Sequence, residues 1–327
     1  MKNLLKNREY QLACLILVMI MLIGFAVPDF VAVGNLFSVY NDTSILIILA
    51  LGQMLVIITR CIDLSVAANV ALTGMVVATI NSTYPDIPVP IIILIGAALG
   101  TLLGMINGLL VWKLNIPAIV VTLGTMSIYR GTVFLLSNGE WINAHQMSEM
   151  FLAIPRTIFL GLPILSWCSI MVIIAFYYFT RHHPLGRKIY AAGNSPTAAY
   201  YIGVDVGKKQ FISFTLSGLL AGIASYLWIS RYAVAYVDIA NGFELQVIAA
   251  CVIGGVSIAG GTGTVFGCVL GALFLGVINN ALPVIGISPF WQMAISGSVI
   301  IIAVIANSRS ERKLGRIILR KAVANAS

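Results

Sequence analysis

The sequence predicts an all-α protein that crosses a membrane about ten times and has both termini on the cytoplasmic side. Hydrophobic residues make up 60% of the 327 positions and charged residues only 9%, whereas about 25% of the residues in a typical soluble domain are charged. The mean hydropathy is +1.00. Long apolar runs recur along the whole chain and leave no room for a separate soluble domain. We therefore expect one transmembrane domain over residues 1–327.

The expected spans are apolar runs separated by loops rich in proline, glycine or charge, since each crossing needs about 20 apolar residues. The first run follows a basic leader and is too long for the core of a signal peptide, so we expect it to be retained. The basic tail at 307–327 is expected to lie on anionic lipid. In chain order, the spans are 10–27, 43–59, 64–80, 89–112, 116–137, 158–180, 211–230, 244–261, 262–282 and 289–306.

Positive charge is concentrated on one side of the expected membrane. The chain has 19 lysines and arginines against 11 acidic residues, a net charge of +8. All of the basic residues except Arg130, Arg156 and Arg231 fall on the side that holds both termini. Because lysine and arginine concentrate in cytoplasmic loops, this side is assigned to the cytoplasm, and the charge does not indicate a nucleic-acid partner.

Glycines recur every four residues in two of the expected spans. Small residues at this spacing share one face of a helix and let two helix backbones approach closely in lipid. We expect these glycines to be helix-packing positions. They are Gly96, Gly100, Gly104 and Gly108 in the span 89–112, and Gly263, Gly267 and Gly271 in the span 262–282.

The span 116–137 has a more polar face than the spans before it. An arginine at this depth needs a partner, a water-filled cavity or a route to the interface, so Arg130 could either snorkel or line a path for a solute. Glu244, at the start of a later span, is a second charged candidate. The candidate translocation-path residues are Thr122, Thr125, Ser127, Arg130 and Glu244.

Arg60 and Asp63 form a charged pair at i, i+3 spacing after the second span. Charged groups near a membrane are functional candidates by default, but this pair can sit at the bilayer surface. We expect an interfacial ion pair at a tight helical hairpin. The alternative is that the pair binds the substrate or a coupling ion.

The longest polar passage of the chain, residues 181–210, lies on the cytoplasmic side. It has Arg187 and Lys188 near one end, Lys208 and Lys209 near the other, and a small-residue, helix-compatible middle. The passage carries no catalytic group. It is typical of a docking loop that a soluble cytoplasmic partner could grip.

The sequence shows no motif for chemistry of its own. A phosphate-binding loop of the form GxxxxGK[ST] needs a lysine, and the glycine-rich SIAGGTGT lies in a stretch without lysine between Lys209 and Lys313. The five cysteines form no CxxC and indicate neither a disulfide framework nor a metal site. We expect no enzymatic activity and no cofactor or metal bound by this chain.

Five stretches of the chain carry a resemblance to a known family. They are RCIDLSVAANVALTGM at 60–75, IPAIVVTLGTMSIYRG at 116–131, GRKIYAAGNSPTAAYYIGV at 186–204, FELQVIAACVIGGVSIAGGTGTVFGCVLGALFLGVINNAL at 243–282 and FWQMAISGSVIIIAVI at 290–305. Together they resemble the ribose-type monosaccharide permeases of bacterial ABC importers. The resemblance covers nearly the whole chain in order, and it looks strongest to the rhamnose and autoinducer-2 branches. It departs at Ala67 and Ala68, where the family more often has glycine.

This resemblance implies a multi-pass permease of the bacterial inner membrane. Such a permease pairs with a second copy or a sister permease, and it receives a monosaccharide or autoinducer-2 from a periplasmic binding protein. A separate cytoplasmic ATPase, which holds ATP and Mg²⁺, drives the import. The positions that match the family's coupling segment to this ATPase are Gly193, Asn194, Ala198, Ala199 and Gly203.

The alternative is an ion-coupled secondary transporter of a small polar solute. That class places carboxylates or broken helices near the bilayer midplane. In this sequence Asp63 and Glu244 fall near the ends of expected spans, which favours the importer.

Overall fold

The computed structural model describes residues 8–288 and, beyond them, 291, 292, 294, 295, 297, 298 and 301. It confirms the prediction of an all-α polytopic protein, because eight of the described helices are long and apolar enough to cross a membrane. Most of the expected span 289–306 and all of the tail 307–327 lie outside the described residues. The eight helices are α1 (Arg8–Ala26), α2 (Val33–Ile58), α3 (Val66–Thr83), α4 (Val89–Leu114), α5 (Ala118–Ser137), α7 (Ile164–His182), α10 (Val206–Tyr232) and α12 (Val265–Val284).

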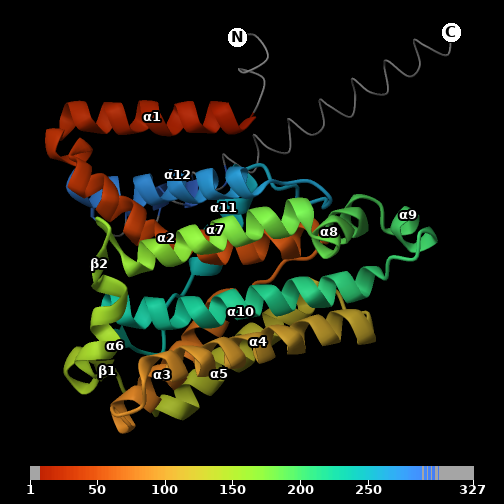
Figure 1. Ribbon diagram of the computed structural model, residues 1–327, viewed down its shortest axis with the longest axis horizontal. Coiled ribbons are helices and arrows are strands. Elements are labelled where there is room, and N and C mark those ends of the chain that lie inside the picture. The colour runs from red at the N-terminus through yellow and green to blue at the C-terminus, as the bar shows by residue number, and fades with distance from the viewer. Residues whose placement is uncertain (1–7, 289–290, 293, 296, 299–300, 302–327) are drawn as a thin grey trace.

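The long helices lie side by side, with α10 in the interior between α2 on one side and α3 and α4 on the other (Figure 1). Helix α2 is buried along nearly its whole length from Thr43 to Ile58, as expected for a helix that is apolar on every face. Helix α1 packs on the outside against α12. Its first turn is held by helix α11 (Phe243–Ile253), because the Arg8 side chain donates to the carbonyl of Val252 at 3.1 Å.

The glycine stripe of α4 lies against α10. A Cβ atom on Gly100 would sit 2.5 Å from Cα of Gly222, and one on Gly104 would sit 2.9 Å from Cα of Gly218. Real Cβ atoms do not approach backbone so closely, so these positions admit only glycine without a shift of one helix. The backbones of α4 and α10 are therefore in direct contact.

The expected span 244–261 is wrong in its second half. Helix α11 (Phe243–Ile253) ends after 11 residues, and residues 254–264 continue without regular structure. Gly255, Gly260 and Gly261 adopt positive φ values of 91°, 86° and 75°, a conformation that ends a helix and that glycine tolerates best. This crossing is consequently half helix and half glycine-rich chain, packed among the other helices.

Two glycines of the second stripe lie at the contact between α12 and α11, and the third does not. A Cβ on Gly267 would overlap the carbonyl of Gly254, and a Cβ on Gly271 would overlap that of Ala250. Gly263, which was expected to be a helix-packing position, precedes α12 and has a φ of 151°. Helix α12 begins only after Thr264, whose side chain caps the backbone N–H of Gly267.

Short elements gather at the two ends of the bundle (Figure 1). The end that carries α8 (Pro184–Asn194) and α9 (Pro196–Tyr201) is the basic one and therefore faces the cytoplasm. At the opposite, outer end, two antiparallel pairs form, with Ile142 opposite Ala235 and Ile158 opposite Pro163. The elements of the outer end are η2 (Pro28–Val31), β1 (Ile142–Asn143), η3 (Ala144–Gln146), α6 (Glu149–Ala153), η4 (Ile154–Arg156), β2 (Ile158–Phe159), β3 (Leu162–Pro163) and β4 (Val234–Ala235).

Candidate functional site

The cytoplasmic passage 181–210 is largely helical, in line with its helix-compatible middle. Pro184 occupies the first turn of α8, where a missing N–H is harmless. The Ser195 side chain then caps α9 at the N–H of Ala198, and the Asp205 side chain caps α10 at the N–H of Lys208. The proline and the capping side chains thus divide the passage into two short helices with defined directions.

Arg60 joins the end of α2 to the end of α8. Its Nε donates to the carbonyl of Gly193 at 2.7 Å, and its Nη2 donates to the carbonyl of Asn194 at 2.9 Å. Carbonyls in the last turn of a helix lack partners within the helix and carry partial negative charge, so a guanidinium is well suited to this position. We call this pair of contacts the Arg60 clamp.

The glycine-rich chain after α11 meets the clamp at the same place. The N–H of Gly261 donates to the carbonyl of Ile58 at 2.9 Å, and the hydroxyl of Tyr190 donates to the carbonyl of Gly263 at 2.8 Å. A Cβ on Gly193 would overlap the carbonyl of Ile58. Burial raises the pKa of Tyr190 to about 12, so this hydroxyl keeps its proton as a donor. Two segments distant in sequence, the end of α2 and the glycine-rich chain, therefore converge on α8.

The expected coupling residues divide into a buried and an exposed set. Gly193 is buried against α2, and Ala199 is buried against Ala192 and Val204. Asn194, Ala198 and Gly203 are exposed. Close to the exposed set, Tyr200, Tyr201 and Ile202 are 75%, 82% and 73% exposed. The buried residues hold α8 and α9 on the bundle, and the exposed ones form a cytoplasmic surface with an unusual amount of apolar area.

The expected ion pair between Arg60 and Asp63 is not formed. Arg60 has a left-handed φ of 65° and points to α8, whereas Asp63 is 3% exposed. Its Oδ1 accepts from the backbone N–H and the hydroxyl of Ser65 at 2.9 and 2.7 Å. Burial raises the pKa of Asp63 to about 6, although the hydrogen bonds from Ser65 oppose the shift. The link also does not form a tight hairpin, because α2 and α3 pack separately on α10.

The expected path residues do not form a single cluster, although Arg130 and Glu244 lie near each other. Thr122 is buried and donates to the carbonyls of Ala118 and Ile62, and Thr125 is buried one turn later. Ser127 lies on the exposed side of α5. Arg130 donates to the carbonyls of Val237 and Ile239 at 3.1 and 2.6 Å, which fixes the chain before α11. Glu244 is half-buried in the first turn of α11, close enough to attract the charge of Arg130.

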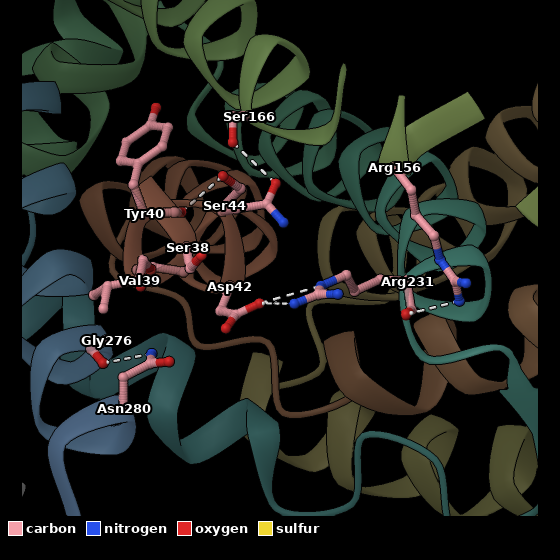
Figure 2. A network of polar contacts seen from close by, with 12 residues as sticks. Ser38, Val39, Tyr40, Asp42, Ser44, Arg156, Ser166, Arg231, Gly276 and Asn280 are labelled. Carbon is pink, nitrogen blue, oxygen red and sulfur yellow. Dashed lines mark hydrogen bonds and ion pairs between the residues drawn. The ribbon is translucent and has the colours of Figure 1, made fainter. Parts of the chain in front are cut away.

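A cavity of about 260 Å³ lies at the outer end, among residues that the sequence did not single out. It is lined by residues of α2, α10, α11 and α12, and the side chains of two of them, Asp42 and Arg231, point toward each other in Figure 2. Polar residues inside apolar spans were the available signal. The lining residues are Asp42, Thr43, Ile45, Leu46, Trp228, Arg231, Tyr232, Phe243, Gln246, Gly276, Asn279 and Asn280.

Within the described part of the chain, no cluster of three histidines, cysteines, aspartates or glutamates has metal-binding geometry. The cavity therefore offers hydrogen-bonding and aromatic groups. The inner end offers an exposed apolar surface on α9, and the hydrogen bonds of Arg60 connect the adjacent α8 to α2.

The chain matches proteins of a known transport family along most of its length. Residues 35–304 match the family described as the permease component of branched-chain amino acid transport systems. The ribose import permease protein RbsC of Escherichia coli strain K12 is 36% identical over 300 residues, which cover 90% of this chain and 92% of RbsC. The autoinducer 2 import system permease protein LsrC of Enterobacter sp. strain 638 is 36% identical over 317 residues, covering 97% of this chain and 91% of LsrC. No solved structure gives a significant match.

Proposed function

The chain belongs to the family of permease components of branched-chain amino acid transport systems, and we propose that it forms the path by which an ATP-driven importer carries a monosaccharide or autoinducer-2. It is a multi-pass protein of the inner membrane. The sugar assignment is supported by relatives that match over nine-tenths of their length and are named for ribose and autoinducer 2. The chain itself would hold no cofactor, since ATP and Mg²⁺ belong on the partner ATPase.

The observation that carries this proposal is the link between α8 and the helices behind it. A cytoplasmic ATPase that moves α8 and α9 would pull on the end of α2 through the Arg60 clamp. Through the hydrogen bond of Tyr190, it would also move the glycine-rich chain that connects α11 to α12. The same helices, α2, α11 and α12, enclose the outer cavity. One rigid movement at the inner end is thereby transmitted to the outer end.

The exposed surfaces at the two ends of the helix bundle indicate the kinds of partner that would bind there. The surface of Tyr200, Tyr201 and Ile202, with Arg187 and Lys188 exposed nearby, suits an ATPase, because aromatic residues and arginine are enriched in protein interfaces. At the outer end, Trp141 is 58% exposed and stacks on Tyr236, which suits a periplasmic binding protein. A second copy of this chain or a sister permease would complete the transporter, and the exposed apolar helix faces would contact lipid.

One observation favours the alternative of an ion-coupled transporter. Helix α11 stops after 11 residues and continues as irregular chain, and interrupted helices are common in secondary transporters.

The energy source distinguishes the ATP-driven importer from the ion-coupled transporter. We expect labelled ribose, rhamnose or autoinducer-2 to enter cells that carry this gene and its ATPase, and uptake to stop when the ATPase is inactivated. Uptake that survives ATPase inactivation but stops on collapse of the ion gradient would establish the alternative.

The role of α9 in this function is tested by a matched pair of glycines. Gly203 and Gly161 have φ values of 76° and 82° and open space around them, but Gly203 lies beside the inner surface and Gly161 at the outer end. We expect Gly203→Trp, and a charge introduced by Asn194→Asp, to reduce uptake while ATP hydrolysis and membrane insertion persist. Gly161→Trp carries the same backbone strain and should retain uptake. Equal uptake in all three variants would show that α8 and α9 do not couple ATP hydrolysis to uptake.

A further inference from the structure

We propose that the outer cavity is a binding station for a single neutral sugar ring on its way through the chain. The assignment rests on the proposed function and adds to it a place and a set of contacts. The cavity lies at the outer ends of α2, α10 and α12 and at the start of α11. A solute released at the outer face would therefore meet it before reaching the Arg60 clamp at the other end.

Size and access fit one sugar ring. The volume of about 260 Å³ is just below the roughly 300–1,000 Å³ of pockets that hold drug-sized ligands. The side chains of Arg231 and Asp42 are 34% and 29% exposed, so the cavity is open to solutes rather than sealed. A disaccharide or a peptide would exceed this space.

The charges in the cavity neutralise each other. Arg231 donates from both Nε and Nη2 to Oδ1 of Asp42, with the Nε contact at 3.1 Å (Figure 2). The backbone of Arg231 is held in turn, because its carbonyl accepts from Nη2 of Arg156 at 3.1 Å. A charged ligand would have to separate this pair and leave one charge without its partner, which is costly in a partly buried site. A neutral solute can instead add hydrogen bonds to it.

Three other polar residues of the lining, Gln246, Asn279 and Asn280, carry carboxamides, which suit hydroxyl groups. Asn279 donates to Oε1 of Gln246 at 3.1 Å, and Asn280 donates to the carbonyl of Gly276 at 2.9 Å. These contacts fix the orientation of the amides. A carboxamide has two donor hydrogens and an acceptor oxygen, so the amide of Asn280, which uses one donor on Gly276, presents further groups to adjacent hydroxyls.

An aromatic wall supplies the apolar contact that a sugar ring also needs. The ring of Trp228 packs edge-on against Phe243, at 4.8 Å between centroids and 86° between planes. The ring of Tyr232 also packs against Trp228, at 5.3 Å between centroids. A sugar ring presents C–H groups on its faces and hydroxyls on its edge. A cavity with aromatic rings on one part of its lining and amides and an ion pair on another matches both features.

The competing ligand is a zwitterionic amino acid, whose carboxylate and ammonium could each take one member of the ion pair. The structure favours the sugar because Arg231 and Asp42 already satisfy each other. The experiment must therefore include leucine as a probe.

Protection of an introduced thiol tests the assignment without requiring transport. Tyr232 is 52% exposed at the cavity, so Tyr232→Cys, made with the exposed Cys14 replaced by serine, should react with a membrane-impermeant thiol reagent in right-side-out vesicles. We expect ribose, rhamnose or autoinducer-2 to slow the reaction at least about twofold once its concentration exceeds Kd. Asn241→Cys, exposed outside the cavity, should react at the same rate with and without sugar.

A second variant checks the contacts. Adding Asn280→Ala to Tyr232→Cys should abolish the protection, and unchanged labelling of Asn241→Cys in that background would show that the chain is folded. Protection by leucine alone would overturn the sugar assignment. Absence of protection by every probe, in cells that still import a sugar through this chain, would overturn the binding station and leave the proposed function standing. Absence of sugar import would overturn the proposed function itself.

Discussion

The guanidinium of Arg60 lies 2.7 Å from the main-chain carbonyl of Gly193, although 133 residues separate the two in sequence. This contact connects the last turn of α8 to the non-helical link that follows α2. Because Gly193 has no side chain, α8 comes close enough for its backbone to touch the end of α2 as well. The relationship makes the position of α8 and the position of α2 interdependent.

Removal of the guanidinium should therefore loosen the link without unfolding the chain. Arg60 has a φ of 65°, which glycine adopts without strain, so Arg60→Gly removes the side chain and preserves the backbone. Hydrogen bonds from a charged group contribute about 1.5–3 kcal/mol when buried, and we expect about 1–2 kcal/mol for this partly exposed pair. Uptake should fall severalfold, whereas ATP hydrolysis by the assembled complex should persist.

The measurement is the ratio of solute imported to ATP hydrolysed in proteoliposomes that contain the full importer. Arg60→Lys is the matched control for charge, since a lysine keeps the charge but cannot span both carbonyls with a planar fork. It should give an intermediate ratio. A ratio for Arg60→Gly equal to that of the wild type would show that the clamp is only structural.

The contact between α4 and α10 gives a prediction about stability. A Cβ at Gly100 would lie 2.5 Å from Cα of Gly222, and the neighbouring atoms belong to backbone that cannot rotate away. We expect Gly100→Ala to destabilise the protein by about 1–3 kcal/mol, as overpacking does in other tight interiors. Thermal unfolding in detergent measures this.

The control is Gly124 on α5, which has open space around it. Gly124→Ala should leave the midpoint unchanged or raise it, because alanine favours a helix by about 0.5–1 kcal/mol over glycine. Equal midpoints for the two variants would mean that α4 and α10 can separate at no cost.

The α4 packing could be predicted from sequence because its signal is local. Glycines at every fourth position of one helix report a close contact, whatever the partner, although only the structure shows that Gly218 and Gly222 of α10 form the other side. The same reasoning failed at Gly263. The four-residue spacing extends back past the start of α12, and Gly263 lies in the non-helical chain before that helix with a φ of 151°.

The two ends of the candidate site could not be predicted, because their residues come from distant segments. Arg60 has Asp63 as its nearest opposite charge in sequence, and local spacing favours that pair. The left-handed backbone of Arg60 instead turns its side chain to α8. Asp42 and Arg231 are 189 positions apart, and nothing in the apolar runs around them shows that α2 and α10 are neighbours.

The carboxyl group of Asp63 gives a prediction about how the stability of the protein depends on pH. Its pKa is raised from 3.8 to about 6 by burial, so between about pH 4 and pH 6 the folded protein binds a proton that the unfolded chain has lost. Stability contributed by this proton is present at low pH and is lost as the pH rises through 6. Asp63→Asn removes the titration and can still accept from the N–H of Ser65. The free energy of unfolding of the wild type, relative to the variant, should therefore decrease from pH 4.5 to 6.5 and then stay level.

The size of this change should be on the order of 1–3 kcal/mol, since each unit of pKa difference corresponds to about 1.4 kcal/mol. Thermal or denaturant unfolding in detergent at a series of pH values gives the difference curve, from which the titrations common to both proteins cancel. Asp86→Asn, at an exposed carboxylate of the outer loop, serves as the control for the loss of one carboxylate. Because the hydrogen bonds from Ser65 favour the charged form, a flat curve for Asp63→Asn would mean that these bonds offset the burial completely and that Asp63 stays ionised throughout this range.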